Sequence, residues 1–197
     1  MRIGLITEGV TDGADQKVCE YLINQLRPEA KIVSRPLGSL KDLRTDCGNT
    51  AALLLAEGCE RILIVWDLYP SWREDGAPPC RHEDKEAIFG ALREAEVELT
   101  RVCLVCIEEE LEAWLLADGR ALSHFFSTPN RAVKIGDKKH PERVDCPKTL
   151  LTRLMKEHTG RLYTDRVHAR QIVERLPDLK RLRNSVTFRR FEAKVVG

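Results

Sequence analysis

Residues 61–67 read Arg-Ile-Leu-Ile-Val-Trp-Asp, a run of five apolar side chains that ends in a carboxylate. A short, continuous apolar run rich in β-branched residues is typical of a strand buried on both faces, as in a parallel sheet. In open α/β sheets, functional groups collect at the carboxyl ends of such strands. The stretch therefore predicts a buried parallel strand, with Asp67 at the sheet edge where a site would lie.

Similar runs recur along the chain, with helical patterns between them. We expect strands at Arg2–Thr7, Lys31–Ser34, Arg61–Trp66 and Arg101–Ile107. Periodicity predicts helices at Ala14–Leu26, Thr50–Glu57, His82–Val97 and Glu108–Ala117, with irregular structure over 35–48. Strands that alternate with helices predict an α/β fold, with a mostly parallel, Rossmann-like sheet flanked by helices on both faces.

The end of the chain has a different pattern. Residues 119–147 are expected to be rich in loops, and helices are expected near Pro147–His158, Arg166–Glu174 and Phe188–Ala193. We therefore expect an α/β domain over 1–120 and a basic, mostly helical C-terminal extension over 121–197 that packs on it.

Charge is divided unevenly along the chain. Residues 1–130 contain 14 Lys and Arg against 23 Asp and Glu, whereas residues 131–197 contain 18 against 8. An acidic part could hold metal and a basic part could bind phosphates. Two plainer interpretations stay open: the two parts attract each other, or the basic helices have solvated faces.

Composition indicates an ordinary globular protein, with 43% hydrophobic and 32% charged residues. No apolar run approaches the ~20 residues that span a bilayer, and the first residues are typical of a strand rather than a signal peptide. We expect no membrane association, a cytoplasmic location and reduced thiols. Cys103 and Cys106 have a CxxC spacing within a strand, which would point the two thiols to opposite faces. Irregularly spaced Cys80, His82, His140 and Cys146 leave a zinc site as a minor alternative.

Acidic residues follow three of the expected strands. They are Glu8 after the first, Asp67 after the third, and Glu108–Glu110 with Glu112 after the fourth. Carboxylates that converge repel one another, so they need protons or a hard cation such as Mg²⁺. Each acid could instead be a turn residue or could face a helix N-terminus. The chain has neither a GxxxxGK[ST] phosphate loop nor a GxSxG nucleophile turn.

The acidic motifs carry a family resemblance. Glu8-Gly9-Val10-Thr11-Asp12 after a strand, with the strand that ends at Asp67, resembles the Toprim domain of topoisomerases, primases and OLD-type nucleases. The chain more specifically resembles a Toprim-like domain-of-unknown-function family, number 4276, whose members are often encoded beside an ABC-type ATPase in settings that suggest phage defence. Further matching stretches are 110–118 (ELEAWLLAD), 145–151, Tyr163 and 182–191.

The resemblance implies roles for the acidic residues. Glu8 would ligate metal or act as general acid or base, and Asp67 would anchor Mg²⁺. The implied catalytic residues are Glu8, Asp67, Glu110 and Glu112, and the implied metal ligands are these four and Asp12. Toprim domains usually carry Asp-x-Asp at the third strand, whereas this chain has Tyr69 at the second position. Either Glu110 or Glu112 supplies the missing oxygens, or a loop acid such as Asp75 does, or the site is weakened.

Together these observations predict a Mg²⁺- or Mn²⁺-dependent nuclease that hydrolyses DNA or RNA, as the effector of an ATPase-linked anti-phage system. Basic residues would contact backbone phosphates without reading sequence; they are Lys148, Arg153, Arg181, Arg183, Arg189 and Arg190. An ABC-type ATPase and a second copy of the chain are candidate partners. Two alternatives stay open: a non-catalytic partner or sensor subunit of an ATPase complex, and a regulatory module that binds nucleotide at the helix after Gly9 and Gly13.

One helical stripe is formed by Leu111, Trp114 and Leu115, which indicates that these side chains belong to the core.

Overall fold

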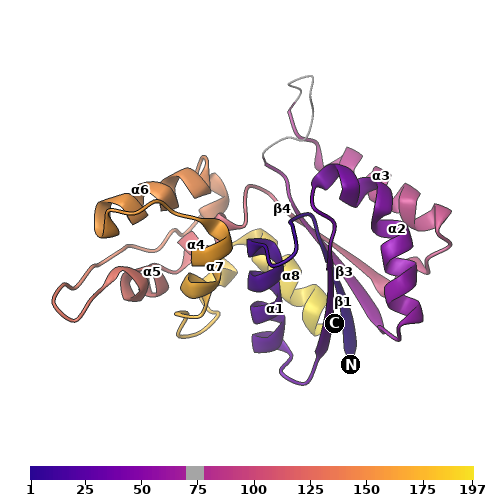
Figure 1. The fold of residues 1–197 in the computed structure, drawn as a ribbon, viewed down its shortest axis with the longest axis horizontal. Helices are drawn as coiled ribbons and strands as arrows, with labels where there is room; N and C mark the ends of the chain where they lie inside the picture. The colour runs from indigo at the N-terminus through magenta and orange to yellow at the C-terminus, as the bar shows by residue number, and fades with distance from the viewer. Residues whose placement is uncertain (70–77) are drawn as a thin grey trace.

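The sheet of the computed structural model, which describes residues 1–69 and 78–197, is parallel throughout. Its four strands are β1 (Arg2–Thr7), β2 (Lys31–Pro36), β3 (Arg61–Asp67) and β4 (Val102–Ile107). They lie in the order β2-β1-β3-β4 (Figure 1). The predicted α/β class with a parallel sheet is confirmed, and all four predicted strands are present.

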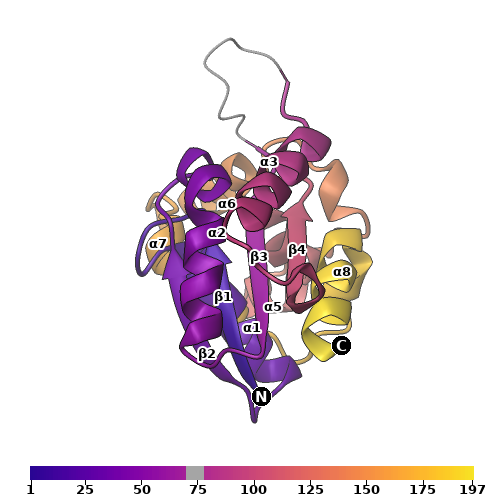
Figure 2. The ribbon, with the colours of Figure 1, turned by 90° about the vertical axis from the view of Figure 1, so that its right-hand side faces the viewer.

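Helices cover both faces of the sheet (Figures 1 and 2). One face packs against α1 (Ala14–Leu26) and α8 (Val186–Val196), and the other against α2 (Leu40–Ala56) and α3 (Arg81–Glu94). The side chains of β3 explain this, because Leu63 and Val65 enter the first cluster while Ile62, Ile64 and Trp66 enter the second. A strand that is apolar on both sides must be covered on both sides.

Helix α2 begins at Leu40, so the prediction of irregular structure over 35–48 was wrong for most of that stretch. Ser39 caps the helix by accepting the backbone N–H of Asp42 at 3.1 Å. Gly48 lies within this helix, although glycine is a poor helix former. Its role is in packing, because a Cβ there would lie 2.0 Å from the carbonyl oxygen of Ala91 on α3. Glycine therefore allows α2 and α3 to approach closely.

Four further helices lie beside the sheet (Figure 1). They are α4 (Glu112–Ala117), α5 (Gly119–Phe126), α6 (Pro147–Thr159) and α7 (Asp165–Val173). Three short 3₁₀ helices accompany them, at Leu99–Arg101, Pro141–Arg143 and Leu182–Asn184. The sequence analysis missed α5, which lies within the stretch expected to be rich in loops.

Trp114 is fully buried, as predicted, and lies in the cluster that joins α4 to α8 and β4. Its ring centroid lies 5.5 Å from that of Phe188 and 5.2 Å from that of Phe191. This single cluster contains side chains from both sides of residue 120. Because the core is shared across residue 120, the division into domains at 1–120 and 121–197 stays a prediction. Helix α8 packs the end of the chain against the sheet.

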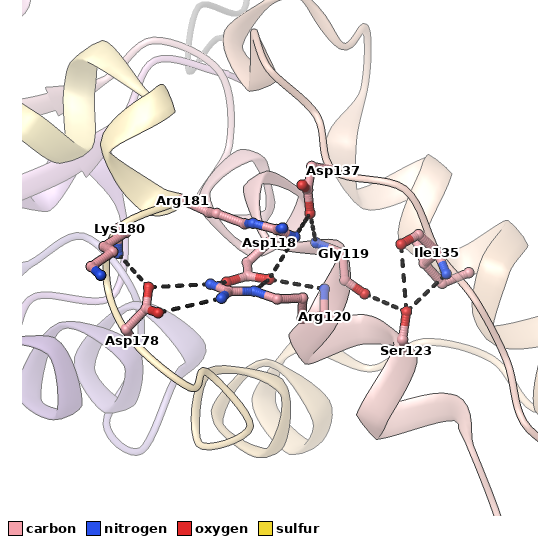
Figure 3. A network of polar contacts seen from close by, with 9 residues as sticks. All are labelled: Asp118, Gly119, Arg120, Ser123, Ile135, Asp137, Asp178, Lys180 and Arg181. Carbon is pink, nitrogen blue, oxygen red and sulfur yellow. Dashed lines mark hydrogen bonds and ion pairs between the residues drawn. The ribbon is translucent and has the colours of Figure 1, made fainter.

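A polar network also crosses residue 120 (Figure 3). Asp118 is fully buried at the N-cap of α5, where it accepts the backbone N–H of Arg120 at 2.8 Å. The Arg120 guanidinium binds the same carboxylate at 2.6 Å and reaches Asp178 at 3.2 Å. A charge buried at this depth needs such a partner, so the network connects α5 to the chain before α8.

Cys103 and Cys106 lie in clusters on opposite faces of the sheet, as predicted for residues three apart on a strand. All seven cysteines have free thiols. Within the described residues, no helix has the length and apolar character needed to cross a membrane.

Candidate functional site

The candidate site lies where the strand order reverses direction. β1 pairs with β2 on one side and with β3 on the other, so the chain moves outward from β1 in both directions. Ligands of open α/β sheets bind at such a switch point, outside the carboxyl ends of the strands. Glu8 follows β1 and Asp67 ends β3, and Glu8 Oε1 accepts the backbone N–H of Asp67 at 2.7 Å.

A pocket of about 240 Å³ opens at this edge of the sheet. Acidic side chains from four different segments line it together with two basic ones. The acidic residues are Glu8, Asp15, Asp67, Glu110, Glu112 and Asp165, and the basic residues are Lys148 and Arg166. Gly9, Val10, Gly13, Ala14 and Tyr69 complete the lining. Four acids identified from the sequence, Glu8, Asp67, Glu110 and Glu112, therefore meet at one pocket.

Asp15 was missed by the sequence analysis. It lies in the first turn of α1 and was counted only as a helix residue. A Cβ at Gly9 would lie 2.5 Å from Asp15 Oδ2, so the glycine of the Glu8-Gly9 motif leaves room for this carboxylate. The glycine was the available signal, because it predicts a close approach of some group to the backbone.

Asp67 is the most constrained acid of the pocket. Its Oδ2 accepts the backbone N–H of Leu111 at 3.0 Å, whereas its buried Oδ1 has no hydrogen-bond partner. Burial, and then the charges of Asp15 and Glu8, raise the pKa of Asp67 well above its ordinary value. An oxygen without a donor inside a cluster of acids is costly, and a bound cation would relieve that cost.

The pKa values of the neighbouring acids are raised as well. Burial raises the pKa of Glu8 to about 8 and that of Asp15 to about 6. Repulsion by Asp15 adds to the rise at Glu8, and repulsion by Asp165 adds to the rise at Asp15. Without a cation, these groups therefore retain protons to a higher pH than ordinary carboxyl groups do.

Glu112 also lines the pocket and is nearly fully buried. The hydroxyl of Tyr163 donates a hydrogen bond to its Oε1 at 3.1 Å. Burial raises the pKa of Glu112 to about 7, although the charge of Lys148 lowers it. Tyr163 therefore holds in place an acid that the pocket would otherwise leave free to rotate.

Lys148 and Asp165 form an ion pair at the rim. The backbone N–H of Lys148 also donates to Glu110 Oε2 at 2.9 Å, which connects the start of α6 to the chain before α4. Lys148 had been predicted to bind nucleic acid. The sequence analysis did not identify Asp165 or Arg166, which lie far along the chain from the acidic motifs and carried no local signal.

A family model described as a domain of unknown function (DUF4276) matches residues 8–195. The chain belongs to this family. No match was found for it among curated proteins or among solved structures. The region matched in the DUF4276 chain includes every residue that lines the pocket.

Three acids predicted near the site of the DUF4276 chain do not line its pocket: Asp12, Glu108 and Glu109. Asp12, an expected metal ligand, is exposed with a φ of 59° and does not line the pocket. Glu108 pairs with Arg81 and Arg190 instead. Asp75, named as a substitute ligand, lies outside the described residues.

Most of the arginines predicted to bind nucleic acid are engaged with protein groups. Arg181 pairs with Asp137, Arg183 with Glu192 and Arg190 with Glu108. Arg189 donates to the carbonyl oxygen of Arg183. Arg153 is exposed on α6, and no carboxylate of the described residues pairs with it. None of these five lines the acidic pocket.

The pocket of the DUF4276 chain fits a hard cation by its chemistry. Every candidate ligand is a carboxylate oxygen, the type that Mg²⁺ and Mn²⁺ prefer, and Asp67 Oδ1 is available. Over residues 1–69 and 78–197, no group of three His, Cys, Asp or Glu side chains is arranged to hold a metal ion. This does not exclude Mg²⁺, since that ion is usually bound by one or two carboxylates and keeps several waters.

Proposed function

We propose that this protein hydrolyses phosphodiester bonds in nucleic acid with Mg²⁺ or Mn²⁺ held at the switch point. The single observation that carries the proposal is the buried Asp67 Oδ1, which has no hydrogen-bond partner and belongs to a residue that lines a pocket with five other acids. Such an oxygen is stabilised by a proton or by a cation. The all-oxygen lining favours a hard divalent ion over zinc.

Asp67 would hold the cation with Glu8 or Asp15, the two acids whose charges act on it most strongly, and water would fill the remaining positions. Mg²⁺ bound there would supply Lewis-acid chemistry for the attack of water on a phosphodiester. Glu112 is held by Tyr163 and Glu110 by the backbone of Lys148. Both can accept a proton from water within the pocket.

Lys148 and Arg166 would bind the phosphate in this pocket. Both line the pocket beside the acids, so a phosphate that approaches the cation also meets two positive side chains. Lys148 pairs with Asp165 and is held close to the acids before any phosphate arrives. These contacts involve only the phosphate, which suits a nuclease that does not read sequence.

A second candidate function is a non-catalytic partner or sensor subunit of an ATPase. Tyr69 favours it, because this exposed side chain lines the pocket where the Toprim pattern has a second carboxylate. An ABC-type ATPase partner and a role in phage defence rest on the family resemblance alone.

A nuclease assay separates the two functions. Purified protein is incubated with plasmid DNA, single-stranded DNA and RNA, with Mg²⁺ or Mn²⁺ and with EDTA. We expect cutting with metal only, and its loss in Glu8→Gln and Asp67→Asn. Failure to cut any substrate, alone or with a candidate ATPase added, would contradict the proposal and favour the partner function.

A further inference from the structure

A second pocket lies against the stretch 133–138, between α5 and α6. This stretch has no regular secondary structure, yet it is held along its length (Figure 3). Ser123 Oγ accepts the backbone N–H of Ile135 at 2.8 Å, and Asp137 Oδ1 accepts that of Gly119 at 2.9 Å. A Cβ at Gly119 would lie 2.3 Å from the carbonyl oxygen of Ile135, so glycine is needed for this approach.

The apolar and basic side chains of the stretch differ in exposure. Val133 and Ile135 are half-buried against the core. Lys134 and Lys138 are exposed, on either side of Gly136. Two ammonium groups are therefore presented to solvent from a backbone that is fixed by hydrogen bonds.

The pocket itself has a volume of about 280 Å³ and combines an apolar floor with a basic rim. The apolar lining consists of Leu116, Leu122, Ile135, Leu150 and Leu154. The basic lining consists of Lys134, Lys138 and Arg153, and no carboxylate among the described residues pairs with any of these three. Asp137 also lines the pocket, but its carboxylate binds Arg181 and Gly119.

Helices α4 and α6 each contribute residues to this pocket and to the acidic one. On α6, Lys148 lines the acidic pocket and Arg153 lines the basic-rimmed one, about 7.5 Å further along the helix axis. On α4, Glu112 lines the first and Leu116 the second. The two pockets therefore share α4 and α6, and a strand that occupied both would pass around α6, because five residues turn a helix by about 140° beyond one full turn.

We infer that the pocket at 133–138 binds the single strand of nucleic acid that leads to the acidic site, with phosphates on Lys134, Lys138 and Arg153. Three cations without carboxylate partners complement phosphates. The apolar floor would receive a base, and only an unpaired, unstacked base can present its face to a protein surface. This inference rests on the proposed function for the position of the cleaved bond and deepens it by naming single-stranded nucleic acid as the substrate.

Binding to labelled oligonucleotides tests the inference. Fluorescence anisotropy is measured for a 12-nucleotide single strand, the same strand with abasic sites, and a 12-base-pair duplex, at several salt concentrations. All proteins carry Asp67→Asn to prevent cutting. The test variant adds Lys134→Gln, Lys138→Gln and Arg153→Gln, and the matched control adds Lys31→Gln, Lys41→Gln and Lys85→Gln, which remove the same charge from the sheet region.

We expect the test variant to bind the single strand at least ten-fold more weakly than the parent at low salt. Its log–log salt slope should be less steep by about 2, because each single-strand phosphate contact contributes ~0.7. The control should change affinity less than three-fold. The parent should bind the abasic strand and the duplex more weakly than the intact strand.

An unchanged affinity and salt slope in the test variant would overturn the inference. So would tighter binding of duplex than of single strand, or displacement of the strand by a polyglutamate peptide at equal charge concentration. The cutting assay on the protein without Asp67→Asn is read separately. If it cuts while the basic variant binds normally, the inference alone fails; if the basic variant loses binding but nothing cuts, the proposed hydrolysis alone fails.

Discussion

The Glu8 carboxylate accepts the backbone N–H of Asp67 at 2.7 Å, so the acids that follow β1 and end β3 are fixed relative to each other across the switch point. Asp67 Oδ1 is also buried without a hydrogen-bond partner. The stability of the metal-free protein, its response to cations and its pH dependence should therefore all depend on these two residues.

Divalent cations should stabilise the folded protein, because the acidic cluster exists only in that state. At a concentration of Mg²⁺ or Mn²⁺ about 100-fold above Kd, the gain in the free energy of unfolding is ~2.7 kcal/mol. Thermal unfolding over a metal titration measures it. Glu8→Gln and Asp67→Asn should lose most of the gain, whereas Asp46→Asn, an exposed acid on α2, should retain it. A melting temperature that does not change across the titration of the wild type would count against a metal site.

Without metal, the raised pKa of Glu8 should make the stability of the folded protein depend on pH. Its pKa is raised from 4.5 to about 8 in the folded state, mainly by burial. Between these values the folded state holds a proton that the unfolded state has lost, so this group lowers the free energy of unfolding as pH rises from about 4.5 to 8. Glu8→Gln removes the effect and should be more stable than the wild type at pH 8, by a few kcal/mol at most.

The measurement is urea unfolding in EDTA at pH 5 and pH 8. At pH 5 the advantage of Glu8→Gln should be small, because Glu8 is protonated in the folded wild type. The pKa of Asp15 is raised in the same direction and its charge acts on Glu8, so the difference reports these two interacting acids together. Equal differences at the two pH values would show that Glu8 titrates normally.

The buried carboxylate of Asp118 should contribute strongly to stability. Asp118→Ala removes the N-cap of α5 and leaves Arg120 without its main partner, and it should cost about 3 kcal/mol. Asp178→Ala is the matched control, because Asp178 binds the same guanidinium from an exposed position and should cost much less. Chemical denaturation of both variants measures the difference, and equal costs would contradict a special role for the buried acid.

The sequence predicted the sheet well and the site in part. Strands β1, β3 and β4 are apolar on both sides, so their pattern needed no knowledge of tertiary contacts. The start of α2 was missed because Gly48 weakens a helix locally, and its reason for being there lies on α3. Asp15 and Asp165 were missed because only the packing of α1 and α7 brings them to the strand ends. The contacts of the arginines in the C-terminal extension could not be predicted either. Each protein group that binds one of them is distant in sequence or was not recognised as its partner.

The final prediction concerns Tyr69, the departure from the Toprim pattern. Tyr69 is exposed and lines the pocket, so Tyr69→Asp adds a carboxylate at the rim with little cost to packing. If Asp67 and either Glu8 or Asp15 already hold the cation, the variant should cut nucleic acid with Mn²⁺ at least as fast as the wild type, because it supplies a further hard ligand. Tyr69→Asn is the matched control, as it removes the ring without adding charge and should leave the rate near that of the wild type.

The measurement is the initial rate of cutting on single-stranded DNA over a Mn²⁺ titration. A lower half-saturating Mn²⁺ concentration for Tyr69→Asp than for Tyr69→Asn would place residue 69 beside the cation. If the wild type is silent and Tyr69→Asp becomes active, the natural site is a weakened one and the sensor function gains support. If both are silent on DNA and RNA, with and without a candidate ATPase, the acidic pocket does not catalyse hydrolysis, and the contact between Glu8 and Asp67 serves the fold alone.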